Sequence, residues 1–307
     1  MNPPECLLKI SGIDKTFPGV KALTQAGLSV YAGQAMALIG ENGAGKSTLM
    51  KVLTGIYTKD AGSIEYLGRE VAFRNPRESQ QAGISIIHQE LNLIGELSIA
   101  ENIFLGREPL TRFGSINWKK LYRDADALLA RLSFPFASDT PVRELSVGEQ
   151  QMVEIAKALS FESRVIIMDE PTTSLTLSET AKLFDIVRNL KKQGKGIVYI
   201  SHKMEEIKQI GDRVTVLKDG KSVGTRSVED VTVDDLIKMM VGREIYGTYL
   251  DKSGADLSKE PVVFEARHIS RKDKKADDVS FQVHKKEILG FFGLIGSGRS
   301  ELMNAIF

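Results

Sequence analysis

The sequence predicts an α/β fold organised around a largely parallel sheet. Short apolar runs of strand length alternate with stretches of helical periodicity along most of the chain. A glycine-rich turn near residue 43 joins one apolar run to a helical stretch, as happens at the ligand-binding edge of such sheets. With 42% apolar and 26% charged residues, the 307-residue chain has the composition of a globular protein with a buried core.

Apolar runs bounded by turn-forming residues are the predicted strands. Residues 35–40 (AMALIG) form a buried strand, and the helical stretch 46–55 follows it across the glycine-rich turn. The further strand predictions are residues 84–88 (ISIIH), 165–169 (VIIMD), 197–201 (IVYIS) and 214–218 (VTVLK). Because these runs alternate with helical stretches, we expect the strands to be mostly parallel.

Two helices carry recognisable start and stop signals. A long helix is predicted to begin with Ser178 as its N-cap and to stop at Gly194. A last helix is predicted to be capped by Thr232 together with Asp235 and to end at Gly242.

Two other stretches define the organisation of the chain. Residues from about 95 to 161 contain no convincing strand and are predicted to be a mostly helical insertion. Residues 251–261 are polar, contain glycine and proline, and are predicted to be a linker.

Charge and composition exclude several classes of protein. The formal net charge of +1 gives no broad basic field for nucleic acid, and the single cysteine, Cys6, cannot form an internal disulfide. The N-terminus lacks the features of a signal peptide, and the longest apolar stretch, residues 288–296, is far shorter than the ~20 residues of a membrane helix. We therefore expect a chain that is soluble by itself and that reaches a membrane only through a partner.

The turn after the first predicted strand matches the phosphate-binding pattern G-x-x-x-x-G-K-[ST]. It consists of Gly40, Glu41, Asn42, Gly43, Ala44, Gly45, Lys46 and Ser47, and Thr48 follows in the first turn of the helix. The glycines allow backbone N–H groups to approach phosphate oxygens, while Lys46 reaches the β- and γ-phosphates and Ser47 can bind Mg²⁺. The pattern predicts a nucleoside triphosphate site.

Acidic and polar residues follow the other predicted strands. Asp169 ends the run 165–169 and Glu170 follows it, so one carboxylate can hold a metal ion and the next can activate water. Gln89 and His202 come directly after two further strands. Since the carboxyl ends of parallel strands share one edge, we expect all of these side chains to converge near Lys46.

Residues 145–159 (LSVGEQQMVEIAKAL) resemble the signature motif LSGGQ and its helix in the ATP-binding subunits of ABC transporters. The segment departs from that motif at Val147 and at Glu149, where the family usually has glycine and glutamine. Ser146 and Gly148 are retained. The resemblance implies that Ser146, Gly148 and Glu149 contact the γ-phosphate of an ATP that is held by a facing domain.

This resemblance also implies a fold and a set of roles. The fold would be that of a P-loop ATPase of the ABC type, with a RecA-like core and a helical subdomain. Phe17 would stack on the adenine, His202 would act on the γ-phosphate as the switch histidine, and Glu170 would be the catalytic carboxylate. Gln89 would link ATP to the permease and would bind Mg²⁺ together with Ser47 and Asp169.

An internal repeat covers part of the chain. Residues 28–50 align without gaps over residues 281–303, at an offset of 253 from Gly40 to Gly293. In the second copy Arg299 replaces Lys46 and Glu301 replaces Thr48, so we expect a weak or structurally used nucleotide site in the full second domain. The repeat is interpreted as the start of a second, degenerate ATPase domain.

The expected domains are therefore residues 1–250 for the first ATPase domain, with a helical subdomain at about 95–161, a linker at 251–261, and a fragment of the second domain at 262–307. We expect the chain to be truncated early in that second domain.

Two fused copies with these motifs are similar to the ATP-binding subunits of bacterial monosaccharide importers. Residues 17–23, 83–94, 100–108 and 238–243 are most similar to those of ribose importers. The resemblance implies ATP hydrolysis with Mg²⁺ at the cytoplasmic face of the inner membrane, as a peripheral protein. Implied partners are permease subunits, a periplasmic sugar-binding protein that acts indirectly, and a second ATPase domain or a second copy, with no nucleic acid.

Two other functions stay open on the sequence alone. A soluble tandem ATPase acting on ribosomes is disfavoured, because the linker is short and the net charge is near zero. A truncated module that binds ATP without turnover is the other alternative, and the dependence of basal ATPase activity on protein concentration would separate it from a working enzyme.

Overall fold

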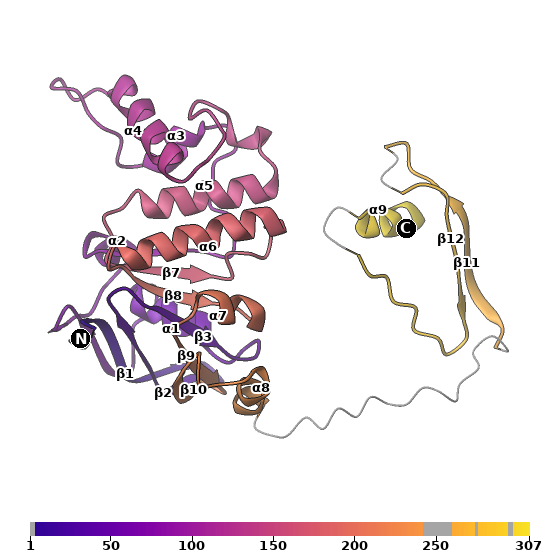
Figure 1. Cartoon of the computed structure of the whole chain (residues 1–307), viewed down its shortest axis with the longest axis horizontal. Coiled ribbons are helices and arrows are strands. Elements are labelled where there is room, and N and C mark those ends of the chain that lie inside the picture. Colours follow the sequence, from indigo (N-terminus) through magenta and orange to yellow (C-terminus); the bar gives the residue numbers. More distant parts are fainter. Residues whose placement is uncertain (1–3, 242–259, 274–275, 294–296) are drawn as a thin grey trace. The chain divides into compact units, whose positions relative to one another are not determined.

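The computed structural model describes residues 4–241, 260–273, 276–293 and 297–307 (Figure 1). The chain forms two compact units, Met1–Glu244 and Ile245–Phe307, and each is described by itself. Most of the predicted linker at 251–261 lies outside the described residues.

A six-stranded sheet in the order β10-β9-β3-β8-β7-β6 is the centre of the first unit. Its strands are β3 Ala35–Ile39, β6 Ile84–Ile87, β7 Val165–Asp169, β8 Gly196–Ile200, β9 Arg213–Lys218 and β10 Lys221–Ser227. All neighbours pair in parallel except β10, which is antiparallel to β9 at the edge. The predicted strands are confirmed, and so is the parallel sheet.

A second, antiparallel sheet was not predicted. It has the order β2-β1-β4-β5 and is built from β1 Cys6–Phe17, β2 Val20–Tyr31, β4 Ala61–Tyr66 and β5 Arg69–Glu70. The pairing of β1 with β2 shifts register between Ile10 and Ile13 and again towards Thr16. Such shifts interrupt the period-2 alternation of buried side chains by which a half-buried strand is recognised in a sequence.

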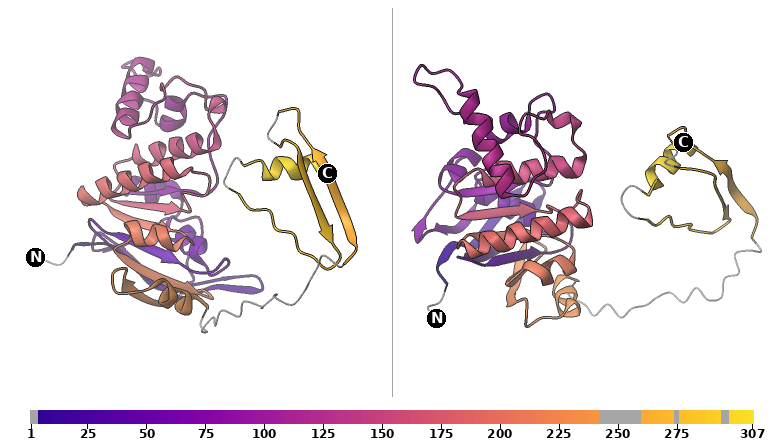
Figure 2. Two further views of the ribbon diagram at one scale, coloured as in Figure 1. Left: turned by 45° about the vertical axis from the view of Figure 1, so that its right-hand side comes forward. Right: turned by 45° about the horizontal axis from the view of Figure 1, so that its top comes forward.

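Helices cover both faces of the parallel sheet (Figure 2). On one face, α1 Lys46–Leu53 buries Leu49, Met50 and Leu53 in the core that also holds the inner residues of β1, β2 and β4. On the other face, α5 Val147–Leu159 and α6 Leu177–Lys192 pack against β7 and β8. Helices α7 Met204–Ile210 and α8 Val233–Val241 pack near β9.

The described residues between 95 and 161 contribute helices and no strand to either sheet. Besides α5 they form α3 Ile99–Phe104, α4 Trp118–Arg131 and the 3₁₀ turn η1 Val142–Glu144; the short α2 Pro76–Gln81 precedes them. Helices α3 and α4 lie beyond α5 on the side away from the sheet, around a small core of Ala100, Leu121 and Ala125 (Figure 1).

The helix ends correct one prediction and confirm another. Helix α6 is capped by Thr176, two residues before the predicted Ser178, because Thr176 and Glu179 form a reciprocal capping box. Gly194, with φ +77°, follows the end of α6 as predicted. Thr232 Oγ1 accepts from the Asp235 N–H and Asp235 accepts from the Thr232 N–H, as predicted for α8, whereas Gly242 lies outside the described residues.

The second unit contains an antiparallel pair and a helix: β11 Val262–Ile269, β12 Val279–His284 and α9 Arg299–Ile306. Gly298 precedes α9 with φ 86°, as Gly45 precedes α1 with φ 99°, so the glycine before the helix is left-handed in both copies. Residues 288–292, which align with β3, form no strand. Strand β3 is paired on both sides, by β8 and β9, and the described part of the second unit provides no strand of that kind.

None of the described helices combines the length and the apolar character that a membrane span requires.

Candidate active site

Four loops meet at the carboxyl edge of the parallel sheet. They follow β3, β6, β7 and β8 and carry Lys46, Gln89, Glu170 with Asp169, and His202. A cavity of about 590 Å³ opens at this edge. Its lining residues are Phe17, Val20, Lys21, Ala22, Asn42, Gly43, Gly45, Lys46, Ser47, Thr48, Gln89, Asp169, Glu170, Asp219 and Gly220.

The glycine-rich turn leaves the N-terminus of α1 open to this cavity. Gly45 has φ 99°, and a Cβ at this position would lie 2.8 Å from both Ala22 O and Leu23 Cδ2, so a side chain does not fit. No side chain caps α1, and the first N–H groups of a helix have no partner within the helix. Together with the helix dipole, these N–H groups make a binding position for an anion.

Lys46 is buried at the base of the turn, with 8% of its surface exposed. Its Nζ donates to the carbonyl oxygens of Gly40, at 2.8 Å, and Glu41, at 3.0 Å. Burial lowers the pKa of Lys46, and the nearby carboxylates of Glu170 and Asp169 oppose that shift. Lys46 therefore holds the turn closed through two carbonyl contacts that phosphate oxygens could replace.

Gly40, Glu41 and Ala44 do not line the cavity but support the turn. The first two supply the carbonyl oxygens for Lys46, and Ala44, 5% exposed, packs beneath the turn and accepts from the Gly220 N–H at 3.1 Å.

Asp169 and Ser47 offer oxygen ligands to a hard cation. Ser47 Oγ lies 3.4 Å from Asp169 Oδ2, and Gln89 lines the same cavity. Burial raises the pKa of Asp169, the adjacent Glu170 adds to this, and the hydrogen bond from Ser47 opposes it. The described residues contain no cluster of three His, Cys, Asp or Glu for a metal ion. A Mg²⁺ ion fits this donor set, since it is bound through one or two carboxylates with phosphate and water oxygens completing the shell.

Glu170 and His202 form a pair beside the metal-binding side chains. Glu170 Oε1 lies 3.1 Å from His202 Nδ1, and the Glu170 side chain is 14% exposed while that of His202 is 56% exposed. Glu170 has φ 47°, which is unfavourable for a residue with a side chain, and its N–H donates to Ile200 O at 3.0 Å. Glu170 is thus fixed in an unusual backbone conformation with its carboxylate directed at the histidine.

Phe17 also lines the cavity, and its ring makes an edge contact with Tyr57 at 5.0 Å between centroids. Sequence reasoning missed Val20, Lys21 and Ala22 at the start of β2, and Asp219 with Gly220 from the β9–β10 turn. The Lys-Asp-Gly sequence at 218–220 is a turn signal. It could have located this second turn but not its place beside the cavity.

The signature residues are not brought into this cavity. Ser146 caps α5 and Glu149 accepts from the Ser146 N–H at 2.7 Å, so the two form a capping box. A Cβ added to Gly148 would lie 2.7 Å from Glu179 Oε2. The N-terminus of α5 is thus flanked by the carboxylates of Glu149 and Glu179.

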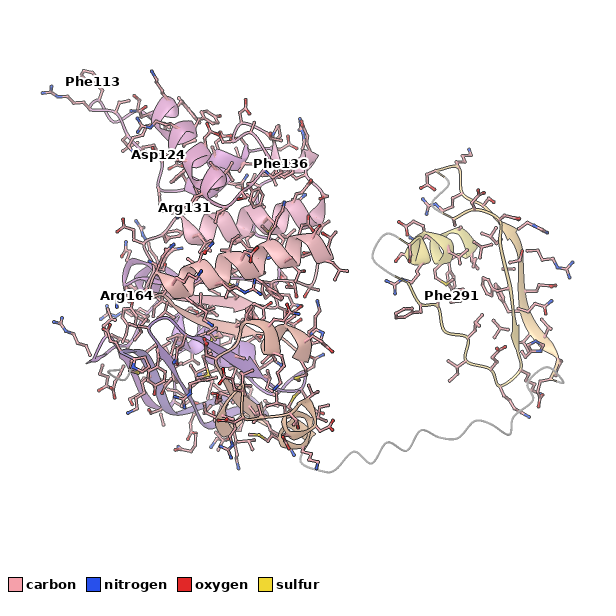
Figure 3. The ribbon with its side chains drawn as sticks, viewed as in Figure 1. Phe113, Asp124, Arg131, Phe136, Arg164 and Phe291 are labelled. Carbon is pink, nitrogen blue, oxygen red and sulfur yellow. The ribbon has the colours of Figure 1, made fainter. Side chains whose placement is uncertain are left out.

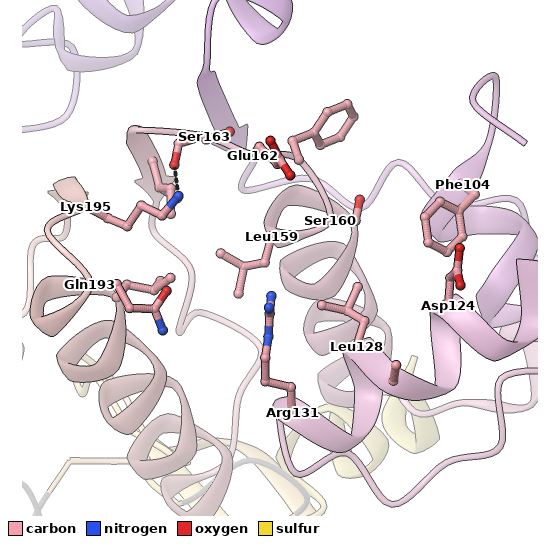
Figure 4. A pocket seen from close by; sticks show the side chains of 14 residues that line it. Phe104, Asp124, Leu128, Arg131, Leu159, Ser160, Glu162, Ser163, Gln193 and Lys195 are labelled. Atoms are coloured by element: carbon pink, nitrogen blue, oxygen red, sulfur yellow. Dashed lines mark hydrogen bonds between the residues drawn. The ribbon is translucent and has the colours of Figure 1, made fainter. Parts of the chain in front are cut away.

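A second hollow, of about 440 Å³, lies between the C-terminal ends of α4, α5 and α6 (Figure 4). It is lined in part by Leu128, Arg131, Leu159 and Gln193, and none of the predicted site residues lines it. Phe113, 94% exposed, lies further out, on a loop that projects from the helical part (Figure 3). Apart from the signature residues, the predicted residues therefore converge on the sheet edge and not on these features.

Comparison with known proteins gives consistent matches. Residues 23–173 match the family described as ABC transporter. The chain is 26% identical to MJ1267, an ATP-binding cassette of an ABC transporter crystallised in an ADP conformation, over 78% of this chain and 99% of that chain, with a TM-score of 0.68. A nucleotide-free ATP-binding cassette from an ABC transporter is also 26% identical, over 78% and 96%, with a TM-score of 0.65. CbiO1 from Clostridium perfringens, part of the ABC transporter complex CbiONQ, shares the fold at 23% identity, over 78% and 95%, with a TM-score of 0.65.

Proposed function

We propose that this chain, which has the α/β P-loop fold of ABC-type ATPases predicted from its sequence, hydrolyses ATP to drive transport. The observation that carries the proposal is the convergence of Lys46, Ser47, Asp169 and Glu170 on one cavity, with His202 3.1 Å from Glu170. Phosphoryl transfer to water requires a helix end that binds the phosphates, oxygen ligands for Mg²⁺ and a carboxylate that orients the attacking water.

In the proposed site, the phosphates of ATP lie at the N-terminus of α1. Lys46 exchanges its carbonyl partners, Gly40 and Glu41, for the β- and γ-phosphates. Mg²⁺ held by Ser47 and Asp169, with Gln89 beside them, would neutralise charge on the phosphate oxygens. Glu170 orients the attacking water and accepts its proton, while His202 contacts the γ-phosphate. Phe17, which lines the same cavity, stacks on the adenine.

The proposal includes a facing ATPase domain, fused or on a second copy. Ser146, Gly148 and Glu149 do not line the cavity of their own domain, which supports a role toward ATP held by another. In that arrangement ATP binding closes the pair and hydrolysis opens it, and this cycle moves the membrane subunits between two states.

A groove of about 730 Å³ supports the proposed contact with a permease. It lies beside the Gln89 loop, since His88 and Asn92 line it, and it mixes apolar with basic side chains such as Leu105, Arg107 and Lys157. A segment of a membrane subunit docked there would sense changes at Gln89. We propose that the protein binds permease subunits in this way, as a peripheral protein on the cytoplasmic face of the inner membrane.

The proposed cargo is a monosaccharide, most specifically ribose, delivered by a periplasmic binding protein. Support comes from the sequence segments 17–23, 83–94, 100–108 and 238–243, which are similar to ribose importer subunits. No side chain of an ATPase domain contacts the sugar. Co-purification with candidate permeases, followed by measurement of sugar-stimulated ATPase activity in vesicles, tests the cargo separately from the chemistry.

The chemistry is tested on the purified full chain. We expect Lys46→Ala to abolish ATP binding, and Glu170→Gln to retain ATP binding while kcat falls by about 10²–10⁴-fold, the usual contribution of a general base. Glu162→Gln, an exposed carboxylate outside the cavity, is the control and should hydrolyse ATP normally. Undiminished hydrolysis by Glu170→Gln would refute the role proposed for that residue.

A further inference from the structure

A buried carboxylate lies beneath the two loops that carry Glu170 and His202. Glu206 on α7 is 6% exposed and receives donors on both oxygens. Thr172 Oγ1 donates to its Oε1 at 2.6 Å, and Lys203 Nζ lies 3.2 Å from the same atom. Tyr199 Oη at 2.8 Å and Ser201 Oγ at 3.0 Å donate to its Oε2. Two donors on each oxygen fill the acceptor capacity of a carboxylate.

The donors come from both sides of the candidate catalytic pair. Thr172 lies two residues after Glu170, while Ser201 and Lys203 flank His202. Lys203 Nζ also donates to Thr172 Oγ1 at 3.1 Å, and the Lys203 N–H donates to Ser201 Oγ at 3.0 Å. The Glu206 side chain, on α7, therefore links the loop after β7 to the loop after β8.

This link joins the two loops through side chains, in addition to the backbone hydrogen bond from the Glu170 N–H to Ile200 O. His202 is 56% exposed, so packing alone does not hold its ring in place. Glu170 has a strained φ of 47°, and such a conformation persists only when surrounding contacts determine it. Burial raises the pKa of the Tyr199 phenol, and the nearby Glu206 carboxylate raises it further. Tyr199 therefore stays protonated and remains a hydrogen-bond donor to Glu206.

We propose that Glu206 is a positioning residue, whose buried carboxylate ties the Glu170 and His202 loops together so that their side chains meet where the γ-phosphate would lie. This inference rests on the proposed ATPase function and adds to it a residue outside the phosphate-binding motifs. Lys46 and Ser47 lie in the first turn of α1, which follows β3, so the link governs the chemical step and not the binding of ATP.

The first test is Glu206→Gln, which keeps the volume of the side chain but turns an amide N–H₂ toward hydroxyl donors. We expect kcat for ATP to fall about 10–100-fold while KM changes by less than about twofold, the pattern of an interaction needed only in the transition state. Glu205→Gln is the matched control, since Glu205 is the exposed neighbour on the same helix. The control should keep both constants.

A second pair of variants separates positioning from simple stability. Thr172→Val and Tyr199→Phe each remove one hydroxyl donor from the same carboxylate, but only Thr172 is on a loop that bears a catalytic residue. We expect both to lower the Tm, and only Thr172→Val to lower kcat by about tenfold or more. In a His202→Ala background the effect of Thr172→Val on kcat should become smaller, because the two residues act through one geometry.

The outcomes are distinguishable. Suppose that the wild-type chain is active. The inference is then overturned, and the proposed function stands, if kcat is unchanged in Glu206→Gln or falls equally in Thr172→Val and Tyr199→Phe. If Glu206→Gln does not fold, the Thr172 and Tyr199 variants decide the question. A well-folded wild-type chain without ATP hydrolysis under any condition overturns the proposed function, and the inference with it.

Discussion

Asp169 and Glu170 are adjacent in sequence, yet the structure gives them different surroundings. Asp169 contacts Ser47, and its pKa is raised because burial disfavours the charged carboxylate and Glu170 adds negative charge nearby. A raised pKa in the fold means that the folded state holds the proton at higher pH than the unfolded chain does. The contribution of Asp169 to stability is therefore full below about pH 3.9, the unfolded value, and is lost as the pH rises through the folded pKa.

We expect Asp169→Asn to stabilise the nucleotide-free protein at pH 7, where the native carboxylate is ionised at a cost. The gain should be on the order of 1 kcal/mol, or about 2–4 °C in Tm for a domain of this size, and should shrink as the pH falls toward 4. Thermal unfolding without Mg²⁺ at both pH values measures it. Asp126→Asn, an exposed carboxylate on α4, is the control. A variant that is less stable than the wild type at pH 7 would contradict this account of Asp169.

At the scale of single residues, the sequence indicated which side chains gather at the sheet edge but not which residues support them. Lys46, Ser47, Asp169 and Glu170 follow predicted strands, and parallel strands bring such positions to one edge. Glu206 gave no signal, because a glutamate in a helix is ordinarily exposed and its burial depends on loops distant in sequence.

Among the elements, α6 shows how local chemistry decides where a helix starts. Thr176 Oγ1 accepts from the Glu179 N–H at 3.3 Å, and Glu179 Oε2 accepts from the Thr176 N–H at 2.7 Å. The pattern T-x-x-E was present in the sequence, and Ser178 lacks an acidic residue at the matching position. The correct N-cap could therefore have been predicted from spacing alone.

We expect Thr176→Ala to lower the free energy of unfolding by about 1 kcal/mol, the usual loss for an N-cap side chain. Ser178→Ala, on the exposed first turn of α6, should change it by less than about 0.5 kcal/mol. Chemical denaturation of both variants measures the difference. Equal losses would show that the two hydroxyls share the capping role, since their oxygens lie 3.1 Å apart.

Strands that are buried on both faces could be predicted from their apolar sequence. Whether an apolar segment finds neighbouring strands to pair with could not. The runs of β3, β7 and β8 are almost wholly apolar, which marks them without knowledge of the fold. Residues 288–292 are apolar in the same way but form no strand among the described residues of the second unit. A strand requires neighbours for its backbone hydrogen bonds, and sequence pattern does not supply them.

For the whole molecule, tertiary contacts between distant segments assemble the candidate cavity. The Gly220 N–H donates to Ala44 O, and the Thr24 N–H donates to Gly220 O. The β9–β10 turn therefore joins the glycine-rich turn to β2 of the antiparallel sheet. These contacts bring Lys21 and Asp219 to the cavity, and they connect segments roughly two hundred residues apart, beyond the reach of local pattern analysis. The signature residues, in contrast, lie outside the cavity of their own domain.

A site completed by a second domain predicts complementation between copies of the chain. Lys46→Ala removes the ATP site but keeps the α5 N-terminus, and Ser146→Arg does the reverse, so we expect each variant alone to be nearly inactive. In an equimolar mixture half of the dimers contain both variants, and each mixed dimer has one complete site of two, so activity should recover to about a quarter of the wild-type value. Wild-type specific activity should also rise with protein concentration, because the active species is the pair. ATPase assays over a concentration series measure both effects. Specific activity that is independent of concentration, together with no recovery on mixing, would mean that copies of this chain do not complete each other's sites.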